Sequence, residues 1–259
     1  MGSETKPTFL GLGAPRSGTT TLHHLLSHHP DVWVPEEKEV HFFTYNHPEV
    51  TGKEGAWDSY LKLFSPGVDH MVRGEISPSY LWVPGTAERI AERLPDARLF
   101  VILRSPVERA ISDFQYSWKY GVNLTEAEAF FRQGISEVQN GKLILGPFTP
   151  SSVVWKGLYA LHLAQYLAVF PPENLEVFLL EDFSKDPASV RRELLTHLGV
   201  QDRENLPVKV RNARDRRERV GVEAQELLVE FYRESVTVLE ELLDRDLGIW
   251  KTVPEPPEP

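Results

Sequence analysis

The stretch that most constrains this chain is residues 8–26, where an apolar segment, a glycine-bounded loop and an amphipathic segment follow one another directly. The apolar run at 9–12 predicts a buried strand, and the leucine spacing within 19–26 predicts a helix. Between them, residues 13–18 begin and end with glycine. A strand, a tight loop and a helix in this order direct loop N–H groups and the positive end of the helix dipole at one point. We therefore expect a phosphate-binding site.

The loop departs from a nucleoside-triphosphate P-loop after its second glycine. The spacing Gly13-x4-Gly18 fits, but a P-loop continues with Lys and then Ser or Thr, which hold the outer phosphates and Mg²⁺. Here Thr19 and Thr20 follow, and the cation, Arg16, lies inside the loop. The structural alternative is a glycine turn that only joins a core strand to a core helix. An Arg combined with three threonines at the helix start favours the phosphate site.

Composition excludes several classes of protein. With 259 residues, 41% hydrophobic and 25% charged, the chain has the composition of an ordinary globular protein. The formal net charge of −10 disfavours a nucleic-acid partner. The absence of Cys excludes a disulfide framework or a thiolate site. Because no apolar run reaches the length of a membrane span and the first residues resemble no signal peptide, we expect a cytoplasmic protein. The oligomeric state is not predicted.

Apolar runs alternate with amphipathic segments along the chain. The expected strands are 9–12, 32–34, 71–76, 98–103 and 175–180. The expected helices are 19–26, 57–64, 86–94, 106–120, 153–170, 187–198, with Gly199 as a C-terminal stop, and 221–243. This alternation predicts right-handed βαβ units in an α/β fold, with a central parallel sheet flanked by helices on both faces. We expect one domain over 1–259, with flexible tails at 1–7 and 252–259.

A second phosphate-binding signal begins where the fourth expected strand ends, at Arg104. Ser105 fits a helix N-cap, Pro106 the first helical position and Glu108 a capping box. Open α/β sheets bind ligands at the carboxyl ends of their strands, and an Arg offers a bidentate fork for phosphate. Ser112, two turns into the helix, adds a hydroxyl donor. The structural alternative is a capped helix whose Arg104 pairs with a surface acid.

Four stretches together resemble the sulfotransferases that use 3′-phosphoadenosine 5′-phosphosulfate (PAPS). Residues 13–20 resemble the family's 5′-phosphosulfate loop, although the family often has Lys where this chain has Arg16. Residues 38–43 are similar to the segment that holds the acceptor base in the glycan-modifying branch, and 74–80 form the third stretch. Residues 104–116 resemble the 3′-phosphate motif. The pairing of the first stretch with the fourth is the specific part of the resemblance.

The resemblance implies in-line transfer of a sulfuryl group from PAPS to an acceptor hydroxyl or amine, leaving the 3′,5′-diphosphate PAP. No metal is implied, since Arg and backbone donors can neutralise the leaving phosphate. Residues 157–159 are similar to a stretch near the nucleotide, and a basic loop at 209–219 matches one that closes over it; a solvated charge run is the alternative there. The implied cofactor-binding residues are Pro15, Arg16, Ser17, Gly18, Thr19, Thr20, Arg104, Ser112, Tyr159, Arg214 and Arg217.

Glu39 is the expected general base, because a hydroxyl becomes a good nucleophile only as its proton is removed. We expect the apolar bulk of Phe42 and Phe43 to raise the pKa of Glu39 toward the working range. His41 is the rival base, and a surface pair between Glu39 and Lys38 is the structural alternative. Arg16 is expected to stabilise charge on the leaving phosphate.

The acceptor is left open by the sequence. Glycan-modifying relatives commonly have Lys where this chain has Ile76, so either Arg16 supplies that charge alone or the acceptor differs. The acidic total charge disfavours a long polyanionic chain. Phe148 and Trp155 are expected to line a pocket for a saccharide, lipid, polyketide or aromatic acceptor.

Two other functions compete with the sulfotransferase. A P-loop nucleotide or small-molecule kinase needs Mg²⁺ and normally the P-loop Lys, which is missing. Asp182, which resembles a Walker B acid, is therefore interpreted as ordering a turn. A non-catalytic nucleotide-binding module is disfavoured by Glu39 and His41. The four histidines within 23–29 lack a carboxylate or Cys at ligand spacing, which disfavours a metal site.

Overall fold

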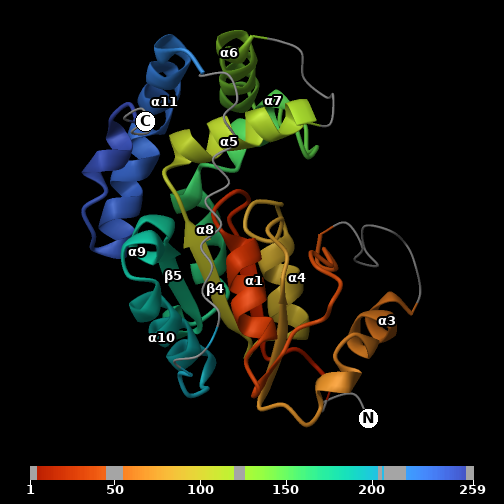
Figure 1. Ribbon diagram of the computed structural model, residues 1–259. Helices are drawn as coiled ribbons and strands as arrows, with labels where there is room; N and C mark the ends of the chain where they lie inside the picture. The colour runs from red at the N-terminus through yellow and green to blue at the C-terminus, as the bar shows by residue number, and fades with distance from the viewer. Residues whose placement is uncertain (1–4, 45–54, 120–125, 204–205, 207–219, 255–259) are drawn as a thin grey trace. The chain divides into compact units, whose positions relative to one another are not determined.

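The computed structural model describes residues 5–44, 55–119, 126–203, 206 and 220–254 (Figure 1). Arg214 and Arg217, like the rest of the basic stretch 209–219, lie outside the described residues. The chain divides into two compact units, each of which is described by itself. Residues 1–103 and 165–212 form the first unit, and residues 104–164 and 213–259 form the second.

The first unit is built on a five-stranded, wholly parallel sheet with the order β2-β3-β1-β4-β5. Its strands are β1 (Phe9–Gly13), β2 (Val32–Trp33), β3 (Val72–Ile76), β4 (Arg98–Leu103) and β5 (Leu175–Leu179). All five predicted strands are therefore present. The central strand β1 pairs with β3 on one side, where Phe9 lies opposite Gly74, and with β4 on the other. The loop after β1 thus starts at the middle of the carboxyl edge of the sheet.

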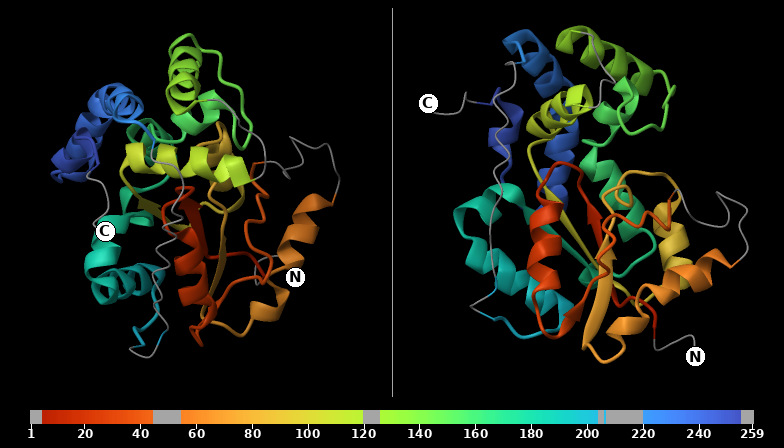
Figure 2. Two further views of the ribbon diagram at one scale, coloured as in Figure 1. Left: turned by 45° about the horizontal axis from the view of Figure 1, so that its top comes forward. Right: turned by 45° about the vertical axis from the view of Figure 1, so that its right-hand side comes forward.

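Helices cover both faces of this sheet, as predicted. Helix α1 (Thr19–Ser27) leads from β1 toward β2, whereas α4 (Thr86–Arg93) leads from β3 to β4, in the opposite direction along the sheet. Right-handed crossovers in opposite directions place their helices on opposite faces, and the right-hand view of Figure 2 shows strands between α1 and α4. The remaining elements of this unit are α3 (Ala56–Lys62), η1 (Ser65–Gly67), η2 (Pro172–Asn174), α9 (Leu180–Lys185) and α10 (Pro187–Leu198).

Apolar side chains of the predicted strands and helices meet in the core on the α1 face of the sheet. Leucines of α1 and α10 pack there against side chains of β1, β4 and β5. Its largest strand residues are Phe9, Phe100 and Phe178, each 3% exposed or less. Gly199 follows α10 with φ 79°, which confirms the predicted helix stop.

The second unit is helical. It contains α5 (Pro106–Lys119), α6 (Ala127–Gln139), α7 (Pro150–Trp155), α11 (Val222–Leu243) and η3 (Gly248–Lys251), and α8 (Tyr159–Leu167) begins in it. Helix α6 was not predicted. The single helix expected at 153–170 is wrong, because α7 and α8 are separate helices. At the break, a Cβ on Gly157 would lie 2.7 Å from the ring of Tyr232, so α11 packs directly against this backbone.

A buried charge cluster joins α5 to α7. The side chains of Arg109, Asp113 and Lys156 are almost fully buried, and the Asp113 carboxylate accepts from Arg109 at 3.3 Å and from Lys156 at 2.9 Å. Lys156 also donates a hydrogen bond to the backbone carbonyl of Pro147 at 2.7 Å. Arg109 likewise donates to the carbonyl of Val153. Two buried cations therefore share one carboxylate within the unit, and each also donates to a backbone carbonyl.

Candidate functional site

The loop after β1 is shaped for an anion. Ala14 N–H donates to the carbonyl of Ile102 at 2.8 Å, which fastens the loop to β4. Arg16 and Gly18 have φ 66° and 95°, so the backbone turns back on itself before α1. Among the residues that the structure describes, no side chain caps the start of α1, and its first turn has no acidic residue. The N-terminus of a helix whose N–H groups lack a side-chain cap suits a phosphate oxygen.

Ser17 supplies an independent sign of a ligand. Its side chain is fully buried, yet its hydroxyl has no hydrogen-bond partner among the residues that the structure describes. A buried donor left unpaired costs about 1–3 kcal/mol, so such groups are rare unless a ligand or water completes them. A phosphosulfate oxygen at the loop would accept from this hydroxyl. The loop residues therefore fit the 5′ end of PAPS.

Lys38 lies beside the loop, a position that the sequence did not reveal. Its ammonium group donates to the Thr20 hydroxyl at 2.5 Å and lies 3.4 Å from the Glu39 carboxylate. The segment with the expected base is thereby attached to the first turn of α1. Lys38 is also a second cation near the loop, in addition to Arg16. Ile76, where relatives commonly have Lys, is 1% exposed and packs in the core.

Glu39 and His41 lie side by side, with the Glu39 Oε2 3.7 Å from the His41 Nε2. The hydrogen bond with His41 and the charge of Lys38 lower the pKa of Glu39 despite its partial burial. The expectation that the phenylalanines raise this pKa is therefore wrong. Phe42 and Phe43 pack in an aromatic group with Trp57 and Tyr60. Glu39 is consequently ionised at neutral pH.

Ser77 and Ser79, in the turn after β3, hold the backbone and the ring of His41. The His41 N–H donates to Ser77 Oγ at 2.9 Å, and its Nδ1 lies 2.6 Å from Ser79 Oγ. Glu39 and His41 have φ 61° and 54°. This left-handed backbone is unfavourable for residues other than glycine, so it persists because surrounding contacts fix it.

Glu75 anchors that turn. Its carboxylate is 2% exposed and accepts hydrogen bonds from Tyr80 at 2.5 Å, Ser77 at 2.7 Å and Tyr60 at 3.3 Å. Burial raises the pKa of Glu75, although the three hydroxyls oppose that shift. The carboxylate faces hydroxyls rather than the loop, so its contacts are those of a structural support.

The second unit contains the other predicted phosphate residues. Ser105 caps α5, where its Oγ accepts from the Glu108 N–H at 3.5 Å, which confirms the predicted N-cap. Arg104 donates from Nε to Glu108 at 3.0 Å, which is the pairing with an acid that the structural alternative describes. The Tyr159 hydroxyl, predicted to lie near the nucleotide, donates to the Arg104 carbonyl at 3.0 Å. Ser112 is half-buried on α5. Tyr159 thus holds the backbone from which the Arg104 side chain extends.

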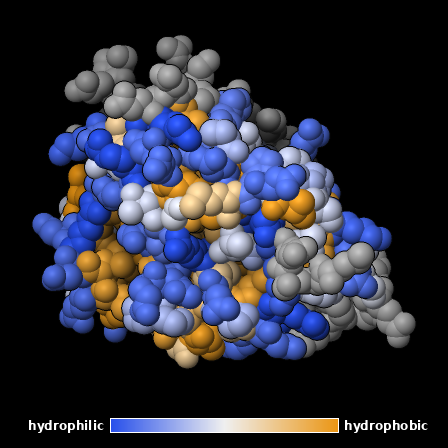
Figure 3. Space-filling model, turned by 90° about the horizontal axis from the view of Figure 1, so that it is seen from below, coloured by the Kyte–Doolittle hydropathy of each residue, from blue (hydrophilic) through white to orange (hydrophobic). Residues whose placement is uncertain are grey.

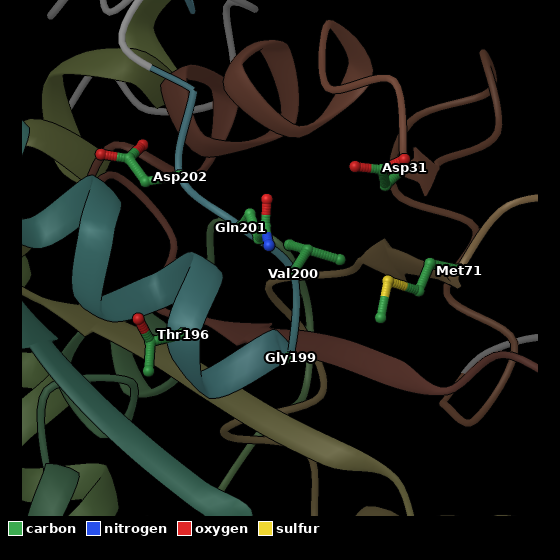
Figure 4. A pocket seen from close by; sticks show the side chains of 7 residues that line it. All are labelled: Asp31, Met71, Thr196, Gly199, Val200, Gln201 and Asp202. Atoms are coloured by element: carbon green, nitrogen blue, oxygen red, sulfur yellow. The ribbon is translucent and has the colours of Figure 1, made fainter.

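A hollow of about 610 Å³ lies at the opposite, amino-terminal edge of the sheet in the first unit. Figure 4 shows the end of α10 and Asp202 on one side and Asp31 and Met71 on the other. Its two carboxylates are already paired, Asp202 with Arg191 at 2.7 Å and Asp31 with Arg203 at 3.4 Å. On the face seen from below, the residues coloured by hydropathy form small hydrophobic groups that hydrophilic residues separate (Figure 3). Ligands of open α/β sheets bind at the other edge.

The described part of the chain contains neither a metal-binding cluster nor a membrane-spanning helix. No group of three or more His, Cys, Asp or Glu side chains there is arranged to hold a metal ion. None of its helices combines the length and the hydropathy needed to cross a membrane.

Comparison with known proteins agrees with this geometry. The family model described as "Sulfotransferase domain" matches residues 6–215. The chain is 32% identical to human heparan sulfate glucosamine 3-O-sulfotransferase 6 over 75% of its own length and 53% of that protein. It is 30% identical to human bifunctional heparan sulfate N-deacetylase/N-sulfotransferase 3 over 75% of its own length and 22% of that protein. It thus spans about half or less of these two relatives.

A solved structure extends the likeness to the whole fold. The crystal structure of a sulfotransferase from Alicyclobacillus acidocaldarius superposes with a TM-score of 0.76 and 31% sequence identity. The alignment covers 95% of this chain and 99% of that one. With a family model that matches most of the sequence and a fold that matches nearly all of it, this chain belongs to the sulfotransferase family.

Proposed function

We propose that this chain is a PAPS-dependent sulfotransferase that sulfates a hydroxyl or amine of a small saccharide. The observation that carries the proposal is the loop at Ser17, where the buried hydroxyl has no partner among the described residues and no described side chain caps the helix start. Lys38 connects this loop to a carboxylate that is ionised at neutral pH. A phosphate cradle and a base are the two parts that sulfuryl transfer needs. The family match spans residues of both units, which supports a single sulfotransferase domain.

In the proposed reaction, Glu39 accepts the proton of the acceptor hydroxyl while the acceptor oxygen forms a bond to sulfur. The bond between sulfur and the bridging oxygen of the 5′-phosphate breaks, and its electron pair stays on PAP. Arg16, Lys38 and loop N–H groups stabilise the charge that develops on that phosphate. PAPS supplies the activated sulfuryl group. The residues of this chain bind and orient PAPS and the acceptor, and they remove the acceptor proton.

Arg104 and Ser112 are proposed to bind the 3′-phosphate of the nucleotide. The support is the sequence motif, together with the fixed backbone of Arg104, whose carbonyl accepts from Tyr159. Arg214 and Arg217 are proposed nucleotide ligands on the strength of the sequence resemblance alone.

A saccharide is the acceptor class to test first, because the names of the relatives specify glucosamine in heparan sulfate. Ile76 and the net charge of −10 favour a short acceptor over a long polyanion. The acceptor screen should therefore contain short neutral and amino sugars beside heparan sulfate fragments, lipids and phenols.

Thermal-shift measurements separate the sulfotransferase from the kinase alternative, which the missing P-loop Lys disfavours. A ligand that binds only the folded state raises the melting temperature. PAP without metal should raise it, and ATP with Mg²⁺ should not. Stabilisation by ATP with Mg²⁺ alone would contradict the proposal.

A further inference from the structure

Lys38 connects the two parts of the candidate site, the phosphate loop and the proposed base. Its ammonium group donates to the hydroxyl of Thr20, in the first turn of α1, at 2.5 Å and lies 3.4 Å from the Glu39 carboxylate. Side chains of neighbouring residues in an extended chain point to opposite sides. Here the backbone turns at Glu39, with φ 61°, and the two neighbouring side chains meet.

Within the described part of the chain, two groups contact this ammonium. A lysine ammonium has three N–H donors and no acceptor. Among the described residues its partners are Thr20 and Glu39, which leaves one donor for a ligand. The side chain of Lys38 is 27% exposed and that of Glu39 is 40% exposed, so a ligand from solution can reach this donor. An accessible cation between a phosphate loop and a carboxylate suits an anionic group.

The charge of Glu39 gives a second reason for a cation at this point. The hydrogen bond with His41 and the charge of Lys38 lower the pKa of Glu39 despite its partial burial, so the carboxylate is ionised at neutral pH. In the in-line transfer proposed above, the loop holds the leaving phosphate and Glu39 faces the acceptor, with the negatively charged sulfuryl group between them. Like charges at close range repel each other, and a cation in contact with both removes that cost.

We propose that Lys38 binds the sulfuryl group of PAPS between Thr20 and Glu39, and thereby increases the affinity for the donor relative to the spent nucleotide PAP. The inference rests on the proposed sulfotransferase function and deepens it. Contacts of the loop with the 5′-phosphate are available to PAPS and PAP alike, whereas the third donor of Lys38 contacts a group that only PAPS has. This contact ends when the sulfuryl group leaves, so it adds to the affinity for PAPS and not to the affinity for PAP.

Isothermal titration calorimetry of the full chain with PAPS and with PAP, in the absence of an acceptor, measures this difference. Lys38→Met keeps an apolar side chain of similar length and removes the charge. It should lower the affinity for PAPS about 10- to 100-fold more than the affinity for PAP, since one charge-assisted hydrogen bond is lost with PAPS alone. Lys38→Arg keeps the charge and should retain most of the affinity for PAPS. Equal losses for the two nucleotides in Lys38→Met, or no loss for either, would overturn the proposal.

Lys62, which is exposed on α3, provides the matched control. Lys62→Met removes the same charge from the chain and should leave both affinities at their parental values. If Lys62→Met lowered the affinity for PAPS as much as Lys38→Met does, the effect would come from the total charge of the chain, and the position of Lys38 would carry no role.

A double-mutant cycle with Glu39→Gln tests whether Lys38 offsets the charge of the base. The neutral amide of Glu39→Gln does not repel the sulfuryl group. Lys38→Met should therefore lower the affinity for PAPS less in the Glu39→Gln background than in the parent. Strictly additive losses would show that Lys38 does not act between the carboxylate and the sulfuryl group, which would contradict the proposed position.

These measurements distinguish failure of the inference from failure of the function. If neither PAPS nor PAP binds to the parent, the proposed function itself fails. If both bind and the parent sulfates an acceptor, but Lys38→Met keeps the parental ratio of the two affinities, the function stands and the role of Lys38 is refuted.

Discussion

The loop region of the first unit and the charge cluster of the second both collect cations, but they differ in what satisfies them. In the cluster, Asp113 pairs with two buried cations, and each cation also donates to a backbone carbonyl, although the Arg109 Nε is left without a partner among the described residues. In the loop region, Lys38 and Glu39 are partly exposed, and the buried hydroxyl of Ser17 has no partner among the described residues. The difference is accessibility: the cluster is closed to solvent and its charges contact one another, whereas the unpaired hydroxyl of Ser17 lies beside accessible charges, which indicates a place for a ligand.

Removal of the proposed base, Glu39, should have the largest effect on turnover. Glu39→Gln should lower kcat about 10²–10⁴-fold with PAP affinity unchanged, because the amide cannot accept the acceptor proton. Steady-state kinetics and calorimetry measure the two quantities. Glu37→Gln, an exposed acid two residues away, is the matched control and should retain parental kcat. Parental turnover in Glu39→Gln, with loss of turnover in His41→Ala, would transfer the role of base to His41.

Substitutions in the buried charge cluster should change the free energy of unfolding instead of the turnover. Asp113→Asn leaves two buried cations without their carboxylate and should lower the free energy of unfolding by about 3–5 kcal/mol. Urea denaturation measures this loss. The control Glu128→Gln breaks the exposed 2.6 Å pair with Arg132 and should cost less than about 1 kcal/mol. Equal losses in the two variants would show that the cluster contributes no more than a surface pair.

Arg104→Ala should weaken PAP binding by about 1.5–3 kcal/mol, the contribution of a charged hydrogen bond, and Ser112→Ala by about 0.5–1.5 kcal/mol. Calorimetric titration with PAP gives both values. Since the Arg104 side chain already pairs with Glu108, the companion variant Glu108→Gln tests whether that pair orients it. If PAP affinity is unchanged in a folded Arg104→Ala protein, Arg104 is only the partner of Glu108.

The smallest expected effect is the contribution of His162 to the pH dependence of the free energy of unfolding. It is fully buried, and burial together with the nearby Arg109 charge lowers its pKa from 6.5 to about 4, although a hydrogen bond from its ring to the Trp155 carbonyl opposes this. Below pH 6.5 the unfolded chain binds a proton that the folded chain refuses, so stability falls as the pH drops from about 6.5 toward 4. The expected contribution is about 2 kcal/mol between pH 7.5 and 5.

Denaturation at several pH values, on the parent and on His162→Gln, isolates this contribution. The variant should lose part of the acid dependence of its unfolding free energy. An identical dependence in both proteins would place the origin of acid destabilisation in other groups.

The sequence predicted the sheet and the phosphate loop because both depend on local patterns. The five strands are short apolar runs, and Gly18 ends the loop one residue before α1 begins, as its spacing indicated. Helix α6 was missed, since Gly134 interrupts its apolar pattern. The break at Gly157 was missed because its cause is Tyr232, distant in the sequence.

The details of the candidate site depend on contacts between distant segments. The position of Lys38 beside Thr20 and the lowered pKa of Glu39 depend on a left-handed backbone held by Ser77. No propensity predicts positive φ at both Glu39 and His41, since such backbone is imposed by tertiary contacts. The residue types of the site were therefore predictable, but their ionisation and mutual arrangement were not.

Mass spectrometry of the complete reaction can show whether the loop at Ser17 holds PAPS for sulfuryl transfer. The chain is incubated with PAPS and a panel of short saccharides, and PAP and sulfated saccharide are quantified together, with Arg16→Ala beside the parent. We predict one PAP for each sulfated product in the parent, and a much lower rate at saturating PAPS in Arg16→Ala. No sulfated product from any acceptor class, or an undiminished rate in Arg16→Ala, would contradict the account.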